Sequence, residues 1–152
     1  MAILEILRST GCRRSSIFDL EWKDIDFQEK EIIIKHRKSK NWSNIPLNPV
    51  LEQALIDYKY SLDGYTANVF DLKKDAFTNM VNKYVKKSGL QEKKDFDITA
   101  HTFRHSFITF LVKQGVPLEK IAKFTGHKDI RSLDIYTHLV ASDLKDVSNL
   151  FN

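Results

Sequence analysis

Strand-forming sequence is concentrated in one short region of the chain, residues 24–47. Within it, three segments have the composition of β-strands and are separated by polar turns: residues 24–27, 31–35 and 44–47. Pro46 indicates a sheet edge or a strand end, because proline has no N–H for a ladder hydrogen bond. These segments predict a small three-stranded antiparallel sheet.

Helical periodicity dominates the rest of the chain. Asn48 followed by Pro49 is a strong helix start, and Thr99 can cap another helix, because such side chains accept hydrogen bonds from free backbone N–H groups. The sequence predicts helices over residues 2–9, 16–22, 49–63, 73–87, 100–114, 117–124, 131–138 and 144–151. The expected fold is therefore α+β, a mainly helical domain with a small three-stranded antiparallel sheet.

Composition excludes several classes of protein. The 152 residues suit one domain, and no internal repeat or linker divides them. The single cysteine, Cys12, excludes an internal disulfide framework and a cysteine-rich metal site. We find no apolar run of about 18 residues and no signal-peptide pattern, so we expect a soluble cytoplasmic protein without a membrane partner. The net charge of +4 permits nucleic acid binding without requiring it.

Four polar side chains of related chemistry lie in the last third of the sequence: His101, Arg104, His127 and Tyr136. His101 and Arg104 are three positions apart, so they share one face of the predicted helix. No carboxylate accompanies the histidines at a metal-ligand spacing, so we expect no metal. A cysteine-dependent triad is disfavoured as well, because no acid follows Cys12 in a helpful position.

A phenol, a guanidinium and imidazoles together suit metal-free phosphoryl transfer, because arginine offers paired donors to phosphate oxygens and histidine exchanges protons near neutral pH. Taken singly, each group has a structural alternative. His127 can be a cap, and Tyr136 can be a half-buried core residue. His105, adjacent to Arg104, is expected to point elsewhere and make a structural hydrogen bond, and His138 is expected to be structural or on the surface. The combination favours chemistry.

Basic side chains upstream offer further phosphate contacts. Arg13 lies between the first two predicted helices, where a guanidinium can reach an anion near the second helix's N-terminus. Arg37, Lys38 and Lys40 lie in the turn between the second and third strands and could contact a phosphate backbone. The alternative for both places is solvated side chains, which carry little specificity alone.

Several motifs occur in a recognisable order. They are residues 10–15 (TGCRRS) with 20–26 (LEWKDID), 101–107 (HTFRHSF), 115–116 (GV) with 125–127 (TGH), and 134–138 (DIYTH). In this order they resemble the catalytic domain of the tyrosine recombinases, the phage integrase family. The resemblance covers nearly the whole chain, and the set formed by H-x-x-R, G-H and Y-T-H is highly specific.

The resemblance implies a role for each matching residue. Tyr136 would attack a scissile DNA phosphate, form a 3′-phosphotyrosyl link and release a 5′-hydroxyl. Arg13 and Arg104 would hold the non-bridging oxygens, and His127 would hydrogen-bond the phosphate. His101 would act in general acid–base chemistry. Strand exchange and religation would then need neither metal nor ATP, and no cofactor is expected.

The resemblance also changes the interpretation of the basic turn. In the family, a lysine between the second and third strands protonates the leaving 5′-oxygen, and Lys38 lies at the expected distance before residues 45–47. Lys40 is the alternative, because turn length varies. Arg37 and Lys40 are the further DNA contacts that the turn would supply.

Three positions depart from the family's pattern. Ser16 stands where an acidic residue is usual, and Cys12 and Thr125 stand where leucine is common. The first change could alter how Arg13 is braced. None of the three removes a catalytic group.

The resemblance has consequences for domain organisation. The family usually carries an N-terminal helical DNA-clamping domain, which is absent here, and residues 2–9 begin without an N-cap. We therefore expect residues 1–152 to be a piece of a longer integrase, namely its catalytic domain without the first part of that domain. We expect the longer protein to assemble as a tetramer on double-stranded DNA. Alone, this piece is expected to be monomeric and to bind DNA weakly. The last predicted helix could pack on its own domain or on a neighbouring protomer through its apolar residues, Leu144, Val147, Leu150 and Phe151.

Two other activities are compatible with the same groups. A type IB topoisomerase-like domain would relax DNA, and a catalytically silent module would keep the fold and only bind DNA. The TGH and YTH motifs and the small size favour the recombinase, and the filled catalytic positions argue against the silent module.

Overall fold

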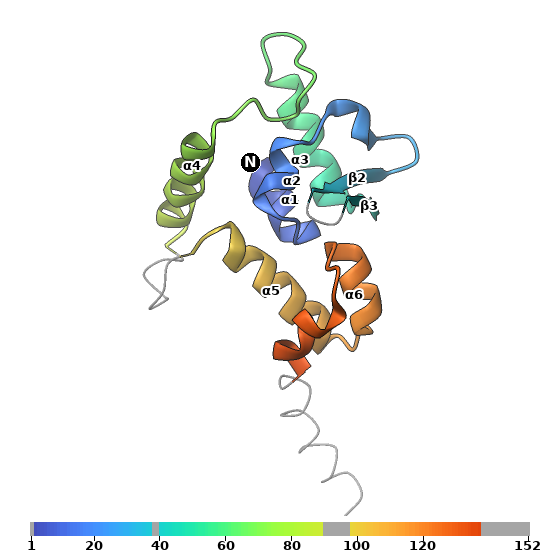
Figure 1. The fold of residues 1–152 in the computed structure, drawn as a ribbon. Helices are drawn as coiled ribbons and strands as arrows, with labels where there is room; N and C mark the ends of the chain where they lie inside the picture. The colour runs from blue at the N-terminus through green and yellow to red at the C-terminus, as the bar shows by residue number, and fades with distance from the viewer. Residues whose placement is uncertain (1, 38–39, 90–97, 138–152) are drawn as a thin grey trace, which may run out of the picture.

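The computed structural model describes residues 2–37, 40–89 and 98–137, and Figure 1 shows their arrangement. The expected α+β class is confirmed, because helices make up most of the fold and a small antiparallel sheet accompanies them. In chain order the elements are α1 (Ala2–Thr10), α2 (Arg14–Phe18), η1 (Trp22–Asp24), β1 (Ile25–Asp26), β2 (Glu31–His36), β3 (Asn41–Pro46), α3 (Pro49–Tyr60), α4 (Lys74–Lys87), α5 (Ala100–Lys113), α6 (Leu118–Thr125) and η3 (Ile130–Tyr136). No helix in these three ranges is long and apolar enough to cross a bilayer.

The predicted sheet has the order β1-β2-β3. β2 pairs with β3 from Glu31 opposite Pro46 to His36 opposite Asn41. β3 therefore begins at Asn41 rather than at residue 44, because its backbone continues the ladder through polar side chains. The strand alternation buries Ser43 and Ile45, which turns one face of the hairpin toward the rest of the molecule.

Helix ends mostly follow the local signals. The side chain of Asn48 accepts hydrogen bonds from the free backbone N–H groups at the start of α3, and Pro49 opens that helix as predicted. Thr99 caps α5 by accepting from the N–H of His101. The helix predicted over residues 131–138 is a 3₁₀-helix, η3. The helix predicted over residues 144–151 lies outside the described part of the chain.

The second helix is displaced from its predicted position. The sequence predicts residues 16–22, whereas α2 spans Arg14–Phe18 and a 3₁₀ turn follows at Trp22–Asp24. The predicted start is wrong because it lies at Ser16, two residues after the first residue of α2. The buried Ser16 hydroxyl instead donates to the backbone carbonyl of Lys35 on β2 at 2.6 Å. Ser16 therefore lies inside α2, and its side chain makes a tertiary contact with β2.

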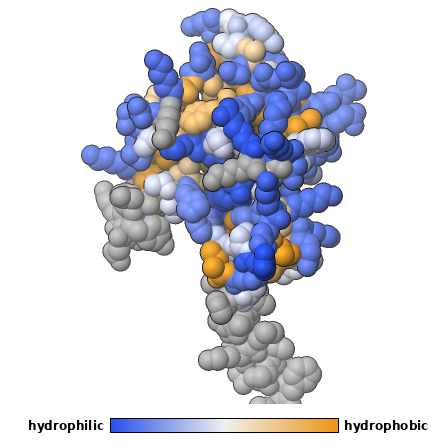
Figure 2. Space-filling model, in the orientation of Figure 1, coloured by the Kyte–Doolittle hydropathy of each residue, from blue (hydrophilic) through white to orange (hydrophobic). Residues whose placement is uncertain are grey.

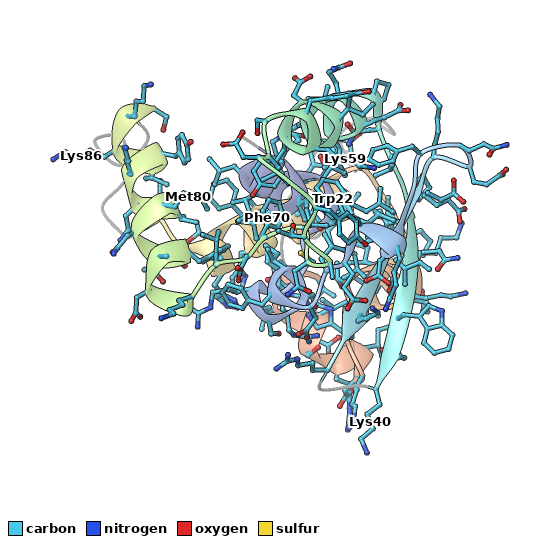
Figure 3. The ribbon with its side chains drawn as sticks, turned by 90° about the horizontal axis from the view of Figure 1, so that it is seen from above. Trp22, Lys40, Lys59, Phe70, Met80 and Lys86 are labelled. Atoms are coloured by element: carbon cyan, nitrogen blue, oxygen red, sulfur yellow. The ribbon has the colours of Figure 1, made fainter. Side chains whose placement is uncertain are left out.

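The larger of two cores joins the N-terminal helices, the sheet, α3 and α4. Its fully buried aliphatic residues include Ile6, Leu7, Ile17, Leu20, Ile32, Ile34, Ile45, Leu51 and Leu55. As the periodicity predicts, α4 buries Phe77, Val81 and Val85. Figure 3 shows Phe70 on the side of Trp22 that faces α4, with both residues next to α3 and within this core. The core holds α2 and the hairpin in a fixed relation.

A smaller core joins α5, α6 and η3, which are yellow to red in Figure 1. It contains Ile108, Val112, Ile121, Ala122, Leu133 and Tyr136. The two cores meet where α5 packs on α1. At this junction Gly11, with φ 56°, lies so close to Phe107 that an added Cβ would collide with the ring. The functional side chains gather beside this junction.

The surface is mostly hydrophilic on the face shown in Figure 2, with apolar side chains in small groups. The large exposed apolar residues in the described ranges are Trp42, Val50, Tyr60, Tyr65, Phe110 and Ile135. Val50 and Tyr60 lie near opposite ends of α3 and the other four lie outside that helix, and single exposed apolar residues are normal for a globular domain.

Candidate active site

Arg104 stands at the centre of the site. Its side chain is buried on α5, with 4% of the residue exposed. Nη1 donates to the backbone carbonyl of Gly11 at 2.8 Å, and Nη2 lies 3.0 Å from Nε2 of His127. One guanidinium therefore bridges the turn after α1 and the turn after α6. Burial, followed by the charge of Arg13, lowers the pKa of Arg104 to about 10, so it stays charged at neutral pH.

His127 is held in one tautomer by its neighbour Thr125. The Thr125 hydroxyl donates to the carbonyl of Ile121 at 2.6 Å, so its only hydrogen is used there. The contact of 2.7 Å between Thr125 Oγ1 and His127 Nδ1 must then be a donation from the ring. Nε2 is left as an acceptor for Arg104. Burial, then the charges of Arg104 and Arg13, lowers the pKa of His127 to about 4, so the ring is neutral.

Arg13 approaches the same turn from the other side. Its Nη1 donates to the carbonyl of Gly126 at 3.0 Å. Gly126 has φ 70° and ends α6 in the left-handed conformation that favours glycine. Neither Arg13 nor Arg104 has a carboxylate within salt-bridge distance in the described part of the chain. Two neighbouring cations without an internal counterion form a site for an anion.

His36, which the sequence interpretation left out, packs under this turn. Its ring occupies the space that a Cβ on Gly126 would need. Nε2 of His36 is 2.8 Å from the Ser43 hydroxyl, and that hydroxyl donates to the carbonyl of Lys123 at 2.6 Å. Burial, then Arg13 and Arg104, lowers the pKa of His36 to about 4. The neutral ring links the turn end of the β2–β3 hairpin to the end of α6.

We refer to Arg13, Arg104 and His127 as the clamp. Tyr136 lies at the end of η3, near enough to Arg104 to feel its charge. Its ring belongs to the smaller core and 6% of the residue is exposed. Its hydroxyl is hydrogen-bonded to Nδ1 of His105, and Nε2 of His105 is 2.7 Å from Nε2 of His101. Burial raises the pKa of the phenol, and the charge of Arg104 opposes that rise. The structure thus brings His105 to Tyr136, whereas the sequence prediction kept it out of the chemistry.

The basic turn of the hairpin is only partly described. Lys38 lies outside the described residues. Arg37 is exposed and forms an ion pair with Asp19. Lys40 is exposed at the start of β3, and Figure 3 shows it at the end of the hairpin, away from Met80 and α4. Exposed ion pairs contribute only about 0–1 kcal/mol, so a phosphate can compete for Arg37.

A cleft of about 400 Å³ opens beside the clamp, between α2, α4 and the first turn of α5. Its lining includes Arg13, Arg14, His101 and Arg104. The positive end of the α5 helix dipole adds partial positive charge. The cleft therefore has the charge that an anionic ligand requires. The described residues contain no group of three His, Cys, Asp or Glu side chains placed to hold a metal ion.

The family model described as the phage integrase family matches residues 1–142. The chain belongs to the phage integrase family. Tyrosine recombinase XerA of Saccharolobus solfataricus is 34% identical over 146 residues, covering 95% of this chain and 47% of the relative. The chain therefore spans about half the length of that relative.

Solved structures share the phage integrase fold. The Tn1549 transposon integrase in complex with a circular intermediate DNA has a TM-score of 0.73 and 25% identity, over 89% of this chain and 52% of that chain. The XerH site-specific recombinase bound to palindromic difH substrate, in a post-cleavage complex, has a TM-score of 0.78 and 22% identity, over 99% of this chain and 45% of that chain.

The structure accounts for the three departures from the usual integrase pattern. Thr125 fixes the tautomer of His127. Ser16 links α2 to β2 through Lys35, so it braces the segment that carries Arg13 without a carboxylate. Cys12 is buried, and burial raises the pKa of its thiol to about 11, which leaves it protonated and inert at neutral pH.

Proposed function

We propose that this chain is the catalytic part of a site-specific DNA recombinase. In the proposed reaction, the phenol oxygen of Tyr136 attacks a scissile phosphate of double-stranded DNA. A 3′-phosphotyrosyl link forms, and the bond to the 5′-oxygen breaks. The observation that supports this most strongly is the pair of guanidiniums, Arg13 and Arg104, which have no carboxylate partner among the described residues, with the charge of Arg104 acting on that phenol.

The proposed clamp stabilises the transition state. Arg13 and Arg104 hold the two non-bridging oxygens, where negative charge is greatest as the phosphorus becomes five-coordinate. His127 already lies 3.0 Å from Arg104 and hydrogen-bonds the same phosphate. Their backbone anchors, the carbonyls of Gly126 and Gly11, fix the two guanidiniums before DNA arrives. Such pre-organisation avoids a reorganisation cost during the reaction.

The leaving 5′-oxygen needs a proton. We assign the donation of this proton to Lys38 in the β2–β3 turn, with Lys40 as the alternative. The ammonium group of lysine can donate a proton, and its flexible side chain can reach the leaving oxygen. Arg37 and Lys40 are proposed to contact the DNA backbone. The links from His36 and Ser43 to the end of α6 support this assignment, because they hold the strand ends that flank the turn against the end of α6.

The proposed chemistry needs no metal and no ATP, because the phosphotyrosyl bond retains the energy of the phosphodiester for religation. We further propose that residues 1–152 act within a longer protein that assembles as a tetramer on DNA. The solved relatives in complex with a circular intermediate DNA and with difH substrate support DNA as the partner. DNA as a substrate agrees with the expected cytoplasmic location.

A covalent-capture experiment tests the assignment of the nucleophile. The chain is incubated with nicked suicide duplexes of randomised sequence, which lose a short strand on cleavage and trap the adduct. We expect a protein–DNA adduct on denaturing gels that Tyr136→Phe abolishes and that the exposed-site control Tyr60→Phe leaves unchanged. An adduct that survives Tyr136→Phe refutes the assignment, and DNA binding without any adduct would indicate a silent module. Relaxation of supercoiled plasmid without exchange would favour the topoisomerase-like activity.

A further inference from the structure

Two histidines and the proposed nucleophile form a continuous hydrogen-bonded row. His101 and His105 lie one turn apart on α5, with ring centroids 4.2 Å apart and ring planes nearly perpendicular at 87°. Their Nε2 atoms are 2.7 Å apart. On the other side of His105, Nδ1 meets the hydroxyl of Tyr136 from η3. Both ring nitrogens of His105 are therefore engaged.

The hydrogen positions in this row follow from counting donors. Tyr136 is almost fully buried, and within the described residues its hydroxyl has His105 as its hydrogen-bond partner. The phenol hydrogen is satisfied only if it is donated to Nδ1 of His105. A neutral His105 then carries its hydrogen on Nε2 and donates it to Nε2 of His101. The row thus points from the phenol, through His105, to His101.

The charges around His105 agree with a neutral, accepting ring. Burial, followed by His101 and Arg104, lowers the pKa of His105 below its ordinary value. The groups that face it are His101 and Arg104 on its own helix, Tyr136 on η3, and His127 after α6. None of these is a carboxylate, so a proton arriving on His105 is not stabilised there. His101 is exposed and can pass that proton to solvent.

We propose that His105 is the general base that takes the phenol proton of Tyr136, and that His101 is the second group of the relay. As the bond from Oη to phosphorus forms and the bond from phosphorus to the 5′-oxygen breaks, the phenol proton moves to Nδ1 of His105. The Nε2 proton of His105 moves to His101. The 5′-oxygen receives a different proton, from the lysine assigned above. Religation runs the same transfers backwards.

This inference rests on the proposed function and changes one part of it. His101 still takes part in acid–base chemistry, but it reaches the nucleophile through His105. The competing explanation is structural: His105 could only hold the Tyr136 ring in place. The two explanations differ in what a non-titrating hydrogen-bond partner can do, since an amide keeps the ring in place but accepts no proton near neutral pH.

The test uses substrates with two leaving groups. Suicide duplexes carry at the scissile phosphate either the natural 5′-oxygen or a bridging 5′-sulfur, whose thiolate leaves without protonation. We measure the rate of adduct formation by His105→Asn, His105→Ala, Lys38→Ala and the exposed-neighbour control Ser106→Ala. Both His105 variants should be slower by about 10²–10⁴-fold on both substrates. Lys38→Ala should be slow only on the oxygen substrate, and Ser106→Ala should match the parent chain.

Two further readouts separate a base from a structural contact. Added imidazole should restore adduct formation by His105→Ala, because it can occupy the space and accept the proton. The rate of the parent chain should fall as acid protonates His105, and His105→Asn should lose that limb of the pH profile. A parent-like rate for His105→Asn, or rescue of His105→Ala by the sulfur substrate, overturns the proposal. Failure of the proposed function is a separate result, namely no adduct from the parent chain or an adduct from Tyr136→Phe.

Discussion

Nη2 of Arg104 lies 3.0 Å from Nε2 of His127. A cation and a neutral imidazole are thus in contact at the point where the proposed phosphate binds. The contact is possible because Thr125 accepts a hydrogen bond from the protonated Nδ1, which leaves Nε2 as an acceptor. A phosphate oxygen needs the opposite at Nε2, a donor. His127 must therefore gain a proton at Nε2 when DNA binds.

DNA binding is expected to raise the pKa of His127. Burial, followed by the charges of Arg104 and Arg13, now holds this pKa at about 4, and the phosphate charge opposes the effect of the two guanidiniums. Donation from Nε2 requires an imidazolium, since Nδ1 already donates to Thr125. NMR titration of the ring should show an increase of about three units on binding a duplex, to about 7, which is about 4 kcal/mol of differential interaction. His36, held by Ser43, serves as the internal comparison and should shift less. An unchanged His127 pKa in the complex contradicts this prediction.

Thr125→Val should weaken catalysis more than folding. Valine matches the shape of threonine but cannot accept from Nδ1 of His127, so the ring loses its fixed tautomer. Loss of one hydrogen bond, about 0.5–1.5 kcal/mol, corresponds to a decrease in the adduct rate of about twofold to twelvefold. Thr66→Val removes an equivalent hydroxyl-to-carbonyl bond in an exposed loop and is the control. Equal rates for the two variants would show that the tautomer does not matter.

Gly126→Ala should destabilise the domain far more than Gly115→Ala. Both glycines have a left-handed φ, 70° and 72°, so both substitutions carry the same backbone cost of about 1–2 kcal/mol. Space around Gly115 is open, whereas a Cβ on Gly126 would collide with the ring of His36. Urea unfolding of the two variants isolates the collision. Similar urea midpoints for the two variants would show that the His36 ring does not lie against Gly126.

Stability should fall as pH drops from about 6.5 to about 4. His36 and His127 have an ordinary pKa of 6.5 and a folded pKa of about 4, so in this window the unfolded chain binds more protons than the folded one. The free energy of unfolding therefore rises with pH there, by at most about 1.4 kcal/mol per unit for each histidine. His36→Gln keeps a donor for Ser43 and should remove about half of this slope. A slope that is unaffected by His36→Gln would assign the acid sensitivity to other groups.

The parts of the fold set by local chemistry could be predicted. Asn48 and Thr99 cap their helices as expected, because a cap needs only one side chain and the next few N–H groups. The position of α2 could not be predicted, because the Ser16 hydroxyl donates to the carbonyl of Lys35, which is distant in the sequence and lies on β2. The start of β3 at Asn41 could not be predicted for a similar reason, since it depends on pairing with His36 on β2.

The candidate site divides along the same line. Arg13, Arg104, His127 and Tyr136 stand in motifs, and the structure brings them to one junction. The spacing of His101 and His105 was visible as an i, i+4 pair, but only the position of η3 shows which of them meets the phenol. His36 left a weaker signal, a single histidine at the end of a strand, and its contact with α6 arises only in the folded molecule.

Main-chain oxygens hold both guanidiniums: Arg104 binds the carbonyl of Gly11, and Arg13 binds that of Gly126. Every amino acid has a main-chain carbonyl, so the anchoring of the two arginines depends directly on the backbone path of the two turns. Mutational drift in neighbouring side chains should be tolerated. A one-residue insertion in either turn would move the acceptor by up to about 3.8 Å and separate an arginine from its anchor. Engineered libraries of this domain should therefore leave the lengths of these turns untouched, together with Gly11, Thr125 and Gly126, and place variation in the other neighbouring side chains.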